Sequence, residues 1–155
     1  MLLHSGEFSY ALTGKRGRRI LGAKGGFRMG YWIFMLVMVL LMPLVMLFTG
    51  RAFSKNAPKK INMVYGYRTA MSMKNQDTWQ FAHRYFGRLW YRCGLVLTPV
   101  TAAVMCLALG KGESAVSWLG SALCIVQLVV LLAPIAPTER ALRRTFDKDG
   151  NRREA

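Results

Sequence analysis

The chain has 155 residues, of which 53% are hydrophobic and 12% aromatic, and it carries 22 Lys and Arg against 7 Asp and Glu. This apolar content excludes a disordered basic tail, because such tails lack the residues that drive collapse. Charged and apolar residues occupy separate stretches, whereas a soluble nucleic-acid-binding domain interleaves them at helical or strand period. Composition therefore favours an all-α integral membrane protein over a soluble bundle with buried helices, and it disfavours nucleic acid as a partner.

Residues 1–28 precede the first apolar stretch and are rich in Gly and Arg, as in GKRGRRILGAKGGFR. One interpretation is a basic arm that lies on anionic lipid. The other, which we favour, is a disordered extension or a mis-assigned start upstream of Met29. A signal peptide is disfavoured, because the apolar run is too long and no small-residue cleavage site follows it.

Three stretches without any charged residue predict three transmembrane helices, at residues 31–48, 93–109 and 115–136. At ~1.5 Å per residue they measure about 27, 26 and 33 Å, close to the ~30 Å thickness of a bilayer's hydrocarbon core. The second stretch is the shortest, and we expect it to continue from a helix before it. None of them contains an ionisable residue of the kind that proton and ion pathways use, which argues against transport.

Each span contains a proline, which removes a backbone donor and leaves a carbonyl one turn earlier without its helical partner. The three are Pro43, Pro99 and Pro134. Membrane helices tolerate prolines where neighbouring helices or hydroxyls, such as that of Thr98, supply a partner. In the third span Gly120, Ser121 and Ala122 are small enough to allow close helix approach.

The loop of residues 49–92 is expected to contain an interfacial amphipathic helix that begins near Asn75. Asn is a good N-cap, and Asp77 in the first turn complements the helix dipole. Arginines recur every four residues on one face, and an apolar stripe occupies another, which suits the boundary between headgroups and acyl chains. The stripe consists of Trp79, Ala82, Phe86, Leu89 and Trp90, and the arginines are Arg84, Arg88 and Arg92.

Basic residues near span ends indicate the orientation in the membrane. The loop and the tail of residues 138–155 share one side and carry fifteen Lys and Arg, against seven on the other side. We therefore predict a cytoplasmic loop and C-terminus and an N-terminus outside. Anionic lipid headgroups are the expected partners of these basic flanks.

Metal and cofactor sites are not predicted. His4 and His83 are too separated for a metal site, and the three cysteines lie in or beside apolar spans as packing thiols. The sequence Asp147-Lys-Asp149-Gly150 resembles the start of a calcium loop, but its glycine falls too early, so a polar turn is expected.

The loop and tail together resemble the SdpI family of small bacterial membrane proteins. The motif begins with Asn62 and the GYRT run and continues through the next twenty residues, and the tail contributes ERALRRTFDKDG. The loop residues are Asn62, Gly66, Tyr67, Arg68, Thr69, Ser72, Asn75, Trp79 and Ala82, and those of the tail are Glu139, Phe146, Asp147, Asp149 and Gly150. Residues 29–155 then form one SdpI-like three-helix domain.

This resemblance implies a bacterial plasma-membrane protein that gives immunity or resistance to a membrane-active antimicrobial peptide. It also implies signalling, in which a cytoplasmic repressor is drawn to the membrane. The expected partners are thus a toxin peptide and a repressor, with no enzyme activity. The alternative is a lipid-headgroup-binding or lipid-modifying membrane enzyme or transporter that uses Tyr67, Arg68 and His83 in the loop.

One contact is predicted between the loop and the tail. Glu139 follows the third span, on the same side of the membrane as Arg68. A partly buried arginine needs a carboxylate or phosphate partner. We therefore expect Arg68 either to pair with Glu139 or to bind a lipid phosphate.

Overall fold

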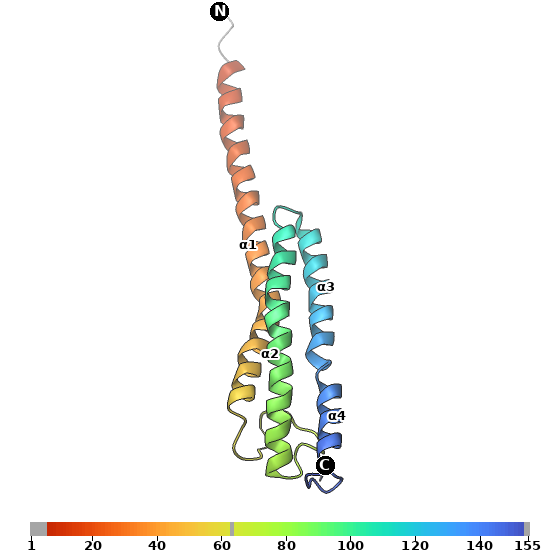
Figure 1. Cartoon of the computed structure of the whole chain (residues 1–155). Coiled ribbons are helices and arrows are strands. Elements are labelled where there is room, and N and C mark those ends of the chain that lie inside the picture. Colours follow the sequence, from red (N-terminus) through yellow and green to blue (C-terminus); the bar gives the residue numbers. More distant parts are fainter. Residues whose placement is uncertain (1–5, 63, 154–155) are drawn as a thin grey trace, which may run out of the picture.

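The computed structural model describes residues 6–62 and 64–153, with side chains from residue 28 onward. Its helices are α1 (Gly6–Lys55), α2 (Gln76–Leu107), α3 (Glu113–Leu132) and α4 (Ile135–Thr145). Figure 1 shows α1, α2 and α3 side by side, with the first half of α1 extending beyond the other helices. The expected extension at residues 1–28 lies, as far as residue 27, outside the part whose side chains are described, and it stays a prediction.

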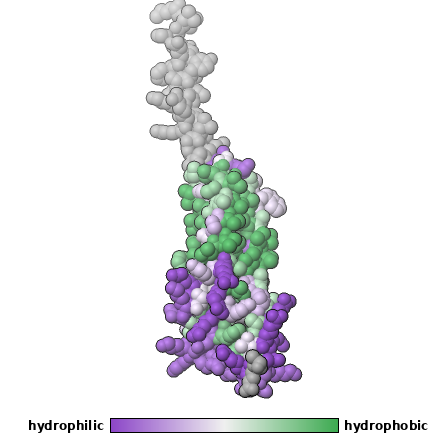
Figure 2. Space-filling view, in the orientation of Figure 1, coloured by the Kyte–Doolittle hydropathy of each residue, from purple (hydrophilic) through white to green (hydrophobic). Residues whose placement is uncertain are grey.

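Three helical segments are long and apolar enough to cross a membrane, namely Arg28–Lys55, Gln76–Leu107 and Glu113–Thr145. They contain the predicted spans 31–48 and 115–136 and all but the last two residues of 93–109, and the chain is a multi-pass membrane protein. On the face that it draws, Figure 2 shows an apolar band over the bundle and hydrophilic side chains gathered at the end that carries the loop and the tail.

The amphipathic segment after Asn75 does not form a separate interfacial helix. It is the first half of α2, which continues without a break into the second span. Trp79 and Ala82 are completely buried and Phe86 nearly so. These three residues of the stripe that we expected to face acyl chains therefore pack inside the protein, because the loop and α4 cover them, whereas Leu89 and Trp90 are half-buried.

Three glycines allow α1 and α2 to pack closely. A Cβ at Gly87 would lie 2.6 Å from the Ser54 backbone nitrogen, one at Gly94 would lie 2.7 Å from that of Leu47, and one at Gly50 would overlap the backbone of α2. Such contacts between backbones are typical of small residues in membrane helices. Among the small residues of the third span, Gly120 has a different neighbour, the flexible side chain of Met35 on α1.

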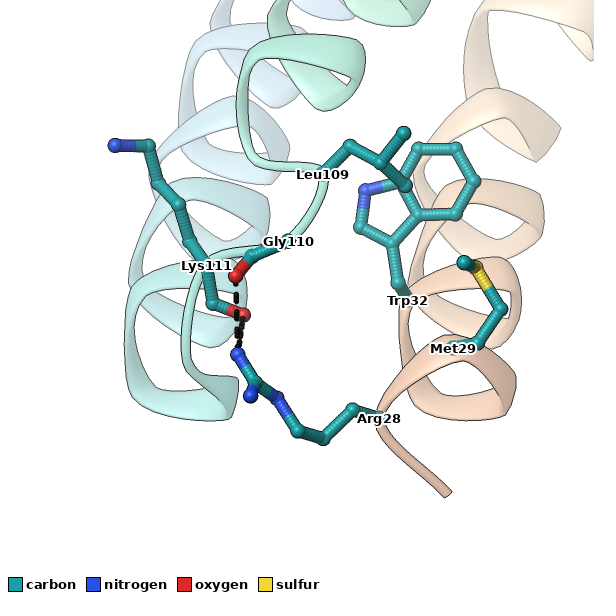
Figure 3. Close-up of a pocket in the computed structure, with 6 residues that line it drawn as sticks. All are labelled: Arg28, Met29, Trp32, Leu109, Gly110 and Lys111. Carbon is teal, nitrogen blue, oxygen red and sulfur yellow. Dashed lines mark hydrogen bonds between the residues drawn. The ribbon is translucent and has the colours of Figure 1, made fainter. Parts of the chain in front are cut away.

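At the opposite end from the loop, Arg28 fastens α1 to the turn between α2 and α3. Its Nη2 donates to the carbonyls of Gly110 at 3.0 Å and Lys111 at 3.1 Å. Figure 3 shows this contact beside a small pocket, where the side chains of Trp32 and Leu109 face each other. The Trp32 indole donates to the Met105 carbonyl at 2.9 Å, so two side chains of α1 hold the end of α2 and the turn that follows it.

The proline in the first span is compensated by a residue of the third. Pro43 has no N–H to donate to the carbonyl of Val39. The completely buried Gln127 of α3 donates from Nε2 to this carbonyl at 3.0 Å and to Thr101 Oγ1 of α2 at 2.9 Å. One side chain therefore ties all three spans together. The expected role of Thr98 is not observed, because its hydroxyl donates to the carbonyl of Gly94 at 2.7 Å, whereas Pro99 affects the carbonyl of Leu95.

We predict that Gln127→Leu lowers the free energy of unfolding in detergent by about 1 kcal/mol, the usual size of an interhelical side-chain hydrogen bond in membranes. In a Pro43→Ala background the Val39 carbonyl regains a helical donor, so the same substitution should cost less. Unfolding of the four proteins of this cycle measures the coupling between positions 43 and 127. An identical cost of Gln127→Leu in both backgrounds would contradict the assignment.

Candidate functional site

The GYRT run follows a tight turn that Asn62 initiates. The Asn62 side chain accepts hydrogen bonds from the backbone N–H groups of Val64 at 3.1 Å and Tyr65 at 3.0 Å. Gly66 then adopts a φ of +110°, in the region that residues with a Cβ rarely occupy. A Cβ at Gly66 would also overlap Nε2 of His83. The glycine is needed for both reasons.

His83 holds the loop against α2. Its Nε2 accepts a hydrogen bond from the backbone N–H of Tyr67 at 2.9 Å, and its Nδ1 lies 2.8 Å from the carbonyl of Trp79. The first bond requires Nε2 to be without a proton, so Nδ1 carries it and donates to the carbonyl. The ring is completely buried and packs against Trp79 and Phe53. Both ring nitrogens are therefore used to fix the backbone.

Tyr67 links the loop to α4. Its hydroxyl lies 3.1 Å from Glu139 Oε1 and 3.3 Å from the carbonyl of Ile135, and its ring packs against Phe86. Burial, with a further contribution from the Glu139 carboxylate, raises the pKa of Tyr67 well above its ordinary value. The hydroxyl therefore stays protonated and acts as a hydrogen-bond donor. The carboxylate of Glu139 also lies 4.0 Å from Arg143.

Two reciprocal hydrogen-bond pairs lead from the loop into α2. The Thr69 backbone N–H donates to Ser72 Oγ at 2.9 Å, and the Ser72 backbone N–H donates to Thr69 Oγ1 at 3.2 Å. Asn75 and Thr78 exchange side-chain and backbone bonds in the same way, which makes a capping box at the start of α2. Trp79 adds a bond from its indole to the carbonyl of Pro58 at 3.1 Å. The predicted N-cap is confirmed.

The C-terminal tail folds beneath this loop. Phe146 is buried in the same apolar cluster as Tyr67 and Phe86, and Asn75 donates from Nδ2 to the Gly150 carbonyl at 2.6 Å. Asp147 accepts hydrogen bonds from the backbone N–H groups of Asp149 and Asn151, each at 2.8 Å. These bonds hold the pKa of Asp147 below its ordinary value. The expected polar turn is therefore present, and the loop and the tail lie at the same end of the molecule.

A pocket of about 470 Å³ lies beside this loop, between α1, α2 and the start of α4. Arg68 is the exposed residue within the GYRT run, and it lines this pocket. The other lining residues are mainly apolar or aromatic: Val45, Thr49, Phe53, Gly66, Tyr67, Thr69, Phe86, Trp90 and Ile135. The loop motif thus places a cation at the edge of an apolar cavity.

The loop residues predicted for the site lie close to one another, and most of them form hydrogen bonds that hold the loop in place. The pairing of Arg68 with Glu139 stays a prediction. Sequence reasoning missed the contribution of α1, because it assigned Val45 to the first span and Thr49 and Phe53 to the loop. Their spacing of four residues was the available signal. Among the described residues, no group of three or more His, Cys, Asp or Glu side chains lies close enough to hold a metal ion.

Comparison with known proteins agrees with the loop motif. The SdpI/YfhL protein family matches residues 59–138, about half of the chain. The uncharacterized protein YfhL of Bacillus subtilis (strain 168) is 42% identical over 76 residues, which cover 49% of this chain and 56% of that protein. The chain therefore spans about half the length of this curated relative. No solved structure matches.

We predict that Gly66→Ala destabilises the protein in detergent by about 2–4 kcal/mol, the range of strained and overpacked substitutions. Gly110→Ala is the matched control, because Gly110 also has a positive φ, of +78°, but nothing lies within 4 Å of its Cβ position. The backbone strain of a Cβ at positive φ should by itself lower the stability of Gly110→Ala by about 1 kcal/mol. Thermal unfolding compares the two variants, and equal losses would show that the contact with His83 does not hold the loop.

Proposed function

Because this chain belongs to the SdpI/YfhL protein family, we propose that it is a non-catalytic resistance protein of the bacterial plasma membrane that protects the cell from a membrane-active peptide. The observation that carries this proposal is the use of the loop motif as a scaffold. His83, Tyr67, Ser72 and Asn75 all have their polar atoms engaged in holding backbone or α4. Because these groups hold the fold and are not free for chemistry, we propose that the motif acts by supporting a binding surface.

The orientation that we propose places the loop and the tail in the cytoplasm, with the N-terminus outside. The excess of Lys and Arg at the loop end supports this orientation. The first half of α2 then lies at the inner membrane surface, where its exposed arginines Arg84, Arg88 and Arg92 meet anionic headgroups. α4 adds exposed Arg140, Arg143 and Arg144, and we propose this basic face as the contact for a cytoplasmic repressor.

The alternative function is a lipid-modifying enzyme or transporter that uses Tyr67, Arg68 and His83. The pocket beside Arg68 favours contact with lipid. Chemistry is disfavoured by the state of the two candidate groups, because a general base needs a free nitrogen within reach of the substrate. His83 is completely buried with both nitrogens engaged, and the Tyr67 hydroxyl is directed to Glu139 and Ile135.

The orientation predicts which positions an impermeant thiol reagent reaches in intact cells. The native cysteines are first replaced by alanine. Lys111→Cys, in the turn between α2 and α3, should then be labelled from outside. Val64→Cys, at a side chain that is 86% exposed in the loop, should be labelled only after the membrane is opened. Labelling of Val64→Cys in intact cells would show that the loop lies outside, which contradicts the proposed orientation.

The resistance function predicts that expression of the full chain raises the survival of a susceptible bacterium challenged with a panel of membrane-active peptides. Gly66→Ala should abolish this protection, because the loop loses its support, and Gly110→Ala should retain it at equal membrane abundance. The purified protein should turn over no phospholipid. Unchanged peptide sensitivity would contradict the resistance function. Phospholipid turnover that His83→Ala abolishes would favour the enzyme instead.

A further inference from the structure

The pocket between α1, α2 and α4 has walls from elements that are distant in the sequence. Val45, Thr49 and Phe53 come from one face of α1, Phe86 and Trp90 from α2, and Ile135 from the first turn of α4. Figure 1 shows α1 and α4 on either side of α2 near the loop. The segment from Gly66 to Thr69 covers the remaining side, so the loop completes the cavity.

The depth of this pocket corresponds to the boundary between headgroups and acyl chains. Val45 lies inside the uncharged stretch of α1, whereas Arg51 begins the charged part of that helix. Val45 is 45% exposed and Leu41, one turn deeper, is 57% exposed, so the apolar wall continues onto the surface that faces lipid. An acyl chain can therefore enter sideways from the bilayer, without crossing water.

The charge at the rim favours an anionic headgroup. Arg68 is exposed, and its guanidinium carries five N–H donors, so a contact within the protein leaves donors for a phosphate. Within the described part of the chain, the pocket lining contains no carboxylate that would repel an anion. Glu139 lies behind the lining and is engaged by Tyr67 and Arg143.

The size of the cavity suits one lipid chain. Pockets for small ligands measure about 300–1,000 Å³ and are mostly apolar with a few polar groups. At about 470 Å³, this pocket lies at the lower end of that range, and its lining is mainly apolar. A peptide helix is about 10 Å wide with its side chains and needs a larger groove.

We propose that this pocket binds one anionic phospholipid of the surrounding bilayer. Its phosphate contacts Arg68, and one acyl chain lies along Val45, Phe86, Trp90 and Ile135. The site does not depend on the resistance function, because lipid occupancy and cell survival are separate measurements. It gives the GYRT motif a specific role, which is to hold Arg68 at the height of the lipid phosphates.

Trp90 lines the pocket and provides a direct readout. The full chain, carrying Trp32→Phe and Trp118→Phe to reduce other emission, is reconstituted in phosphatidylcholine vesicles with a small fraction of phosphatidylglycerol that has brominated chains. We expect Trp90 quenching to saturate at low phosphatidylglycerol content. Brominated phosphatidylcholine at the same fraction should quench only in proportion to its random contact with the protein.

Two variants test the two halves of the site. Arg68→Gln should weaken the apparent affinity for phosphatidylglycerol at least about tenfold, because a charged hydrogen bond is lost. Ile135→Phe keeps Arg68 but narrows the cavity, and it should reduce quenching as well. Lys111→Gln is the control for the loss of one positive charge, since Lys111 is exposed in the turn between α2 and α3 and lies outside this pocket's lining, and it should bind like the parent protein.

Four outcomes would overturn the proposal. Equal quenching by the two brominated lipids would show ordinary contact with the bilayer, and an unchanged Arg68→Gln would remove the headgroup site. Displacement of the lipid by millimolar inorganic phosphate would show that the site recognises an anion and not a lipid. A membrane-active peptide that shifts Trp90 emission, where phosphatidylglycerol does not quench it, would assign the pocket to a peptide.

Discussion

The structure depends on one constraint, which is that backbone polar groups removed from water need partners inside the protein. Pro43 leaves the Val39 carbonyl without a helical donor, and Gln127 supplies one from another span. Tryptophan side chains do the same at the ends of helices: Trp32 donates to Met105 and Trp90 to Leu131. The packing of the three spans is therefore specified by directed hydrogen bonds as well as by close contacts at glycines.

The same constraint explains the loop outside the membrane. Its irregular backbone packs against α2, so His83 accepts a hydrogen bond from it and Ser72 donates one to it, while Asn75 caps the start of α2. A histidine and a tyrosine near an arginine resemble a catalytic group in the sequence, but here they hold the chain in place. These contacts place Arg68 beside an apolar pocket. Both proposals, lipid binding and peptide resistance, concern this one region of the molecule.

Much of the architecture could be predicted from the sequence. The absence of charge over residues 31–48, 93–109 and 115–136 determines three membrane helices, because a charged side chain in hydrocarbon is costly and an apolar one is not. Asn75 as an N-cap and the polar turn after Asp147 were also predictable, since both depend on neighbours within a few residues. The motif identified the family for the same reason, because its loop residues lie within one short stretch, from Asn62 to Ala82.

Tertiary structure decided the environment of each side chain. The stripe of Trp79, Ala82 and Phe86 has the period of a helix that lies on a membrane, and periodicity alone does not distinguish burial against lipid from burial against protein. The partner of the Val39 carbonyl and the α1 wall of the pocket come from residues that are distant along the chain. The sequence by itself determined which segments leave water, because that depends on local composition. Only the fold decided what each buried group contacts, because those contacts form when distant segments pack together.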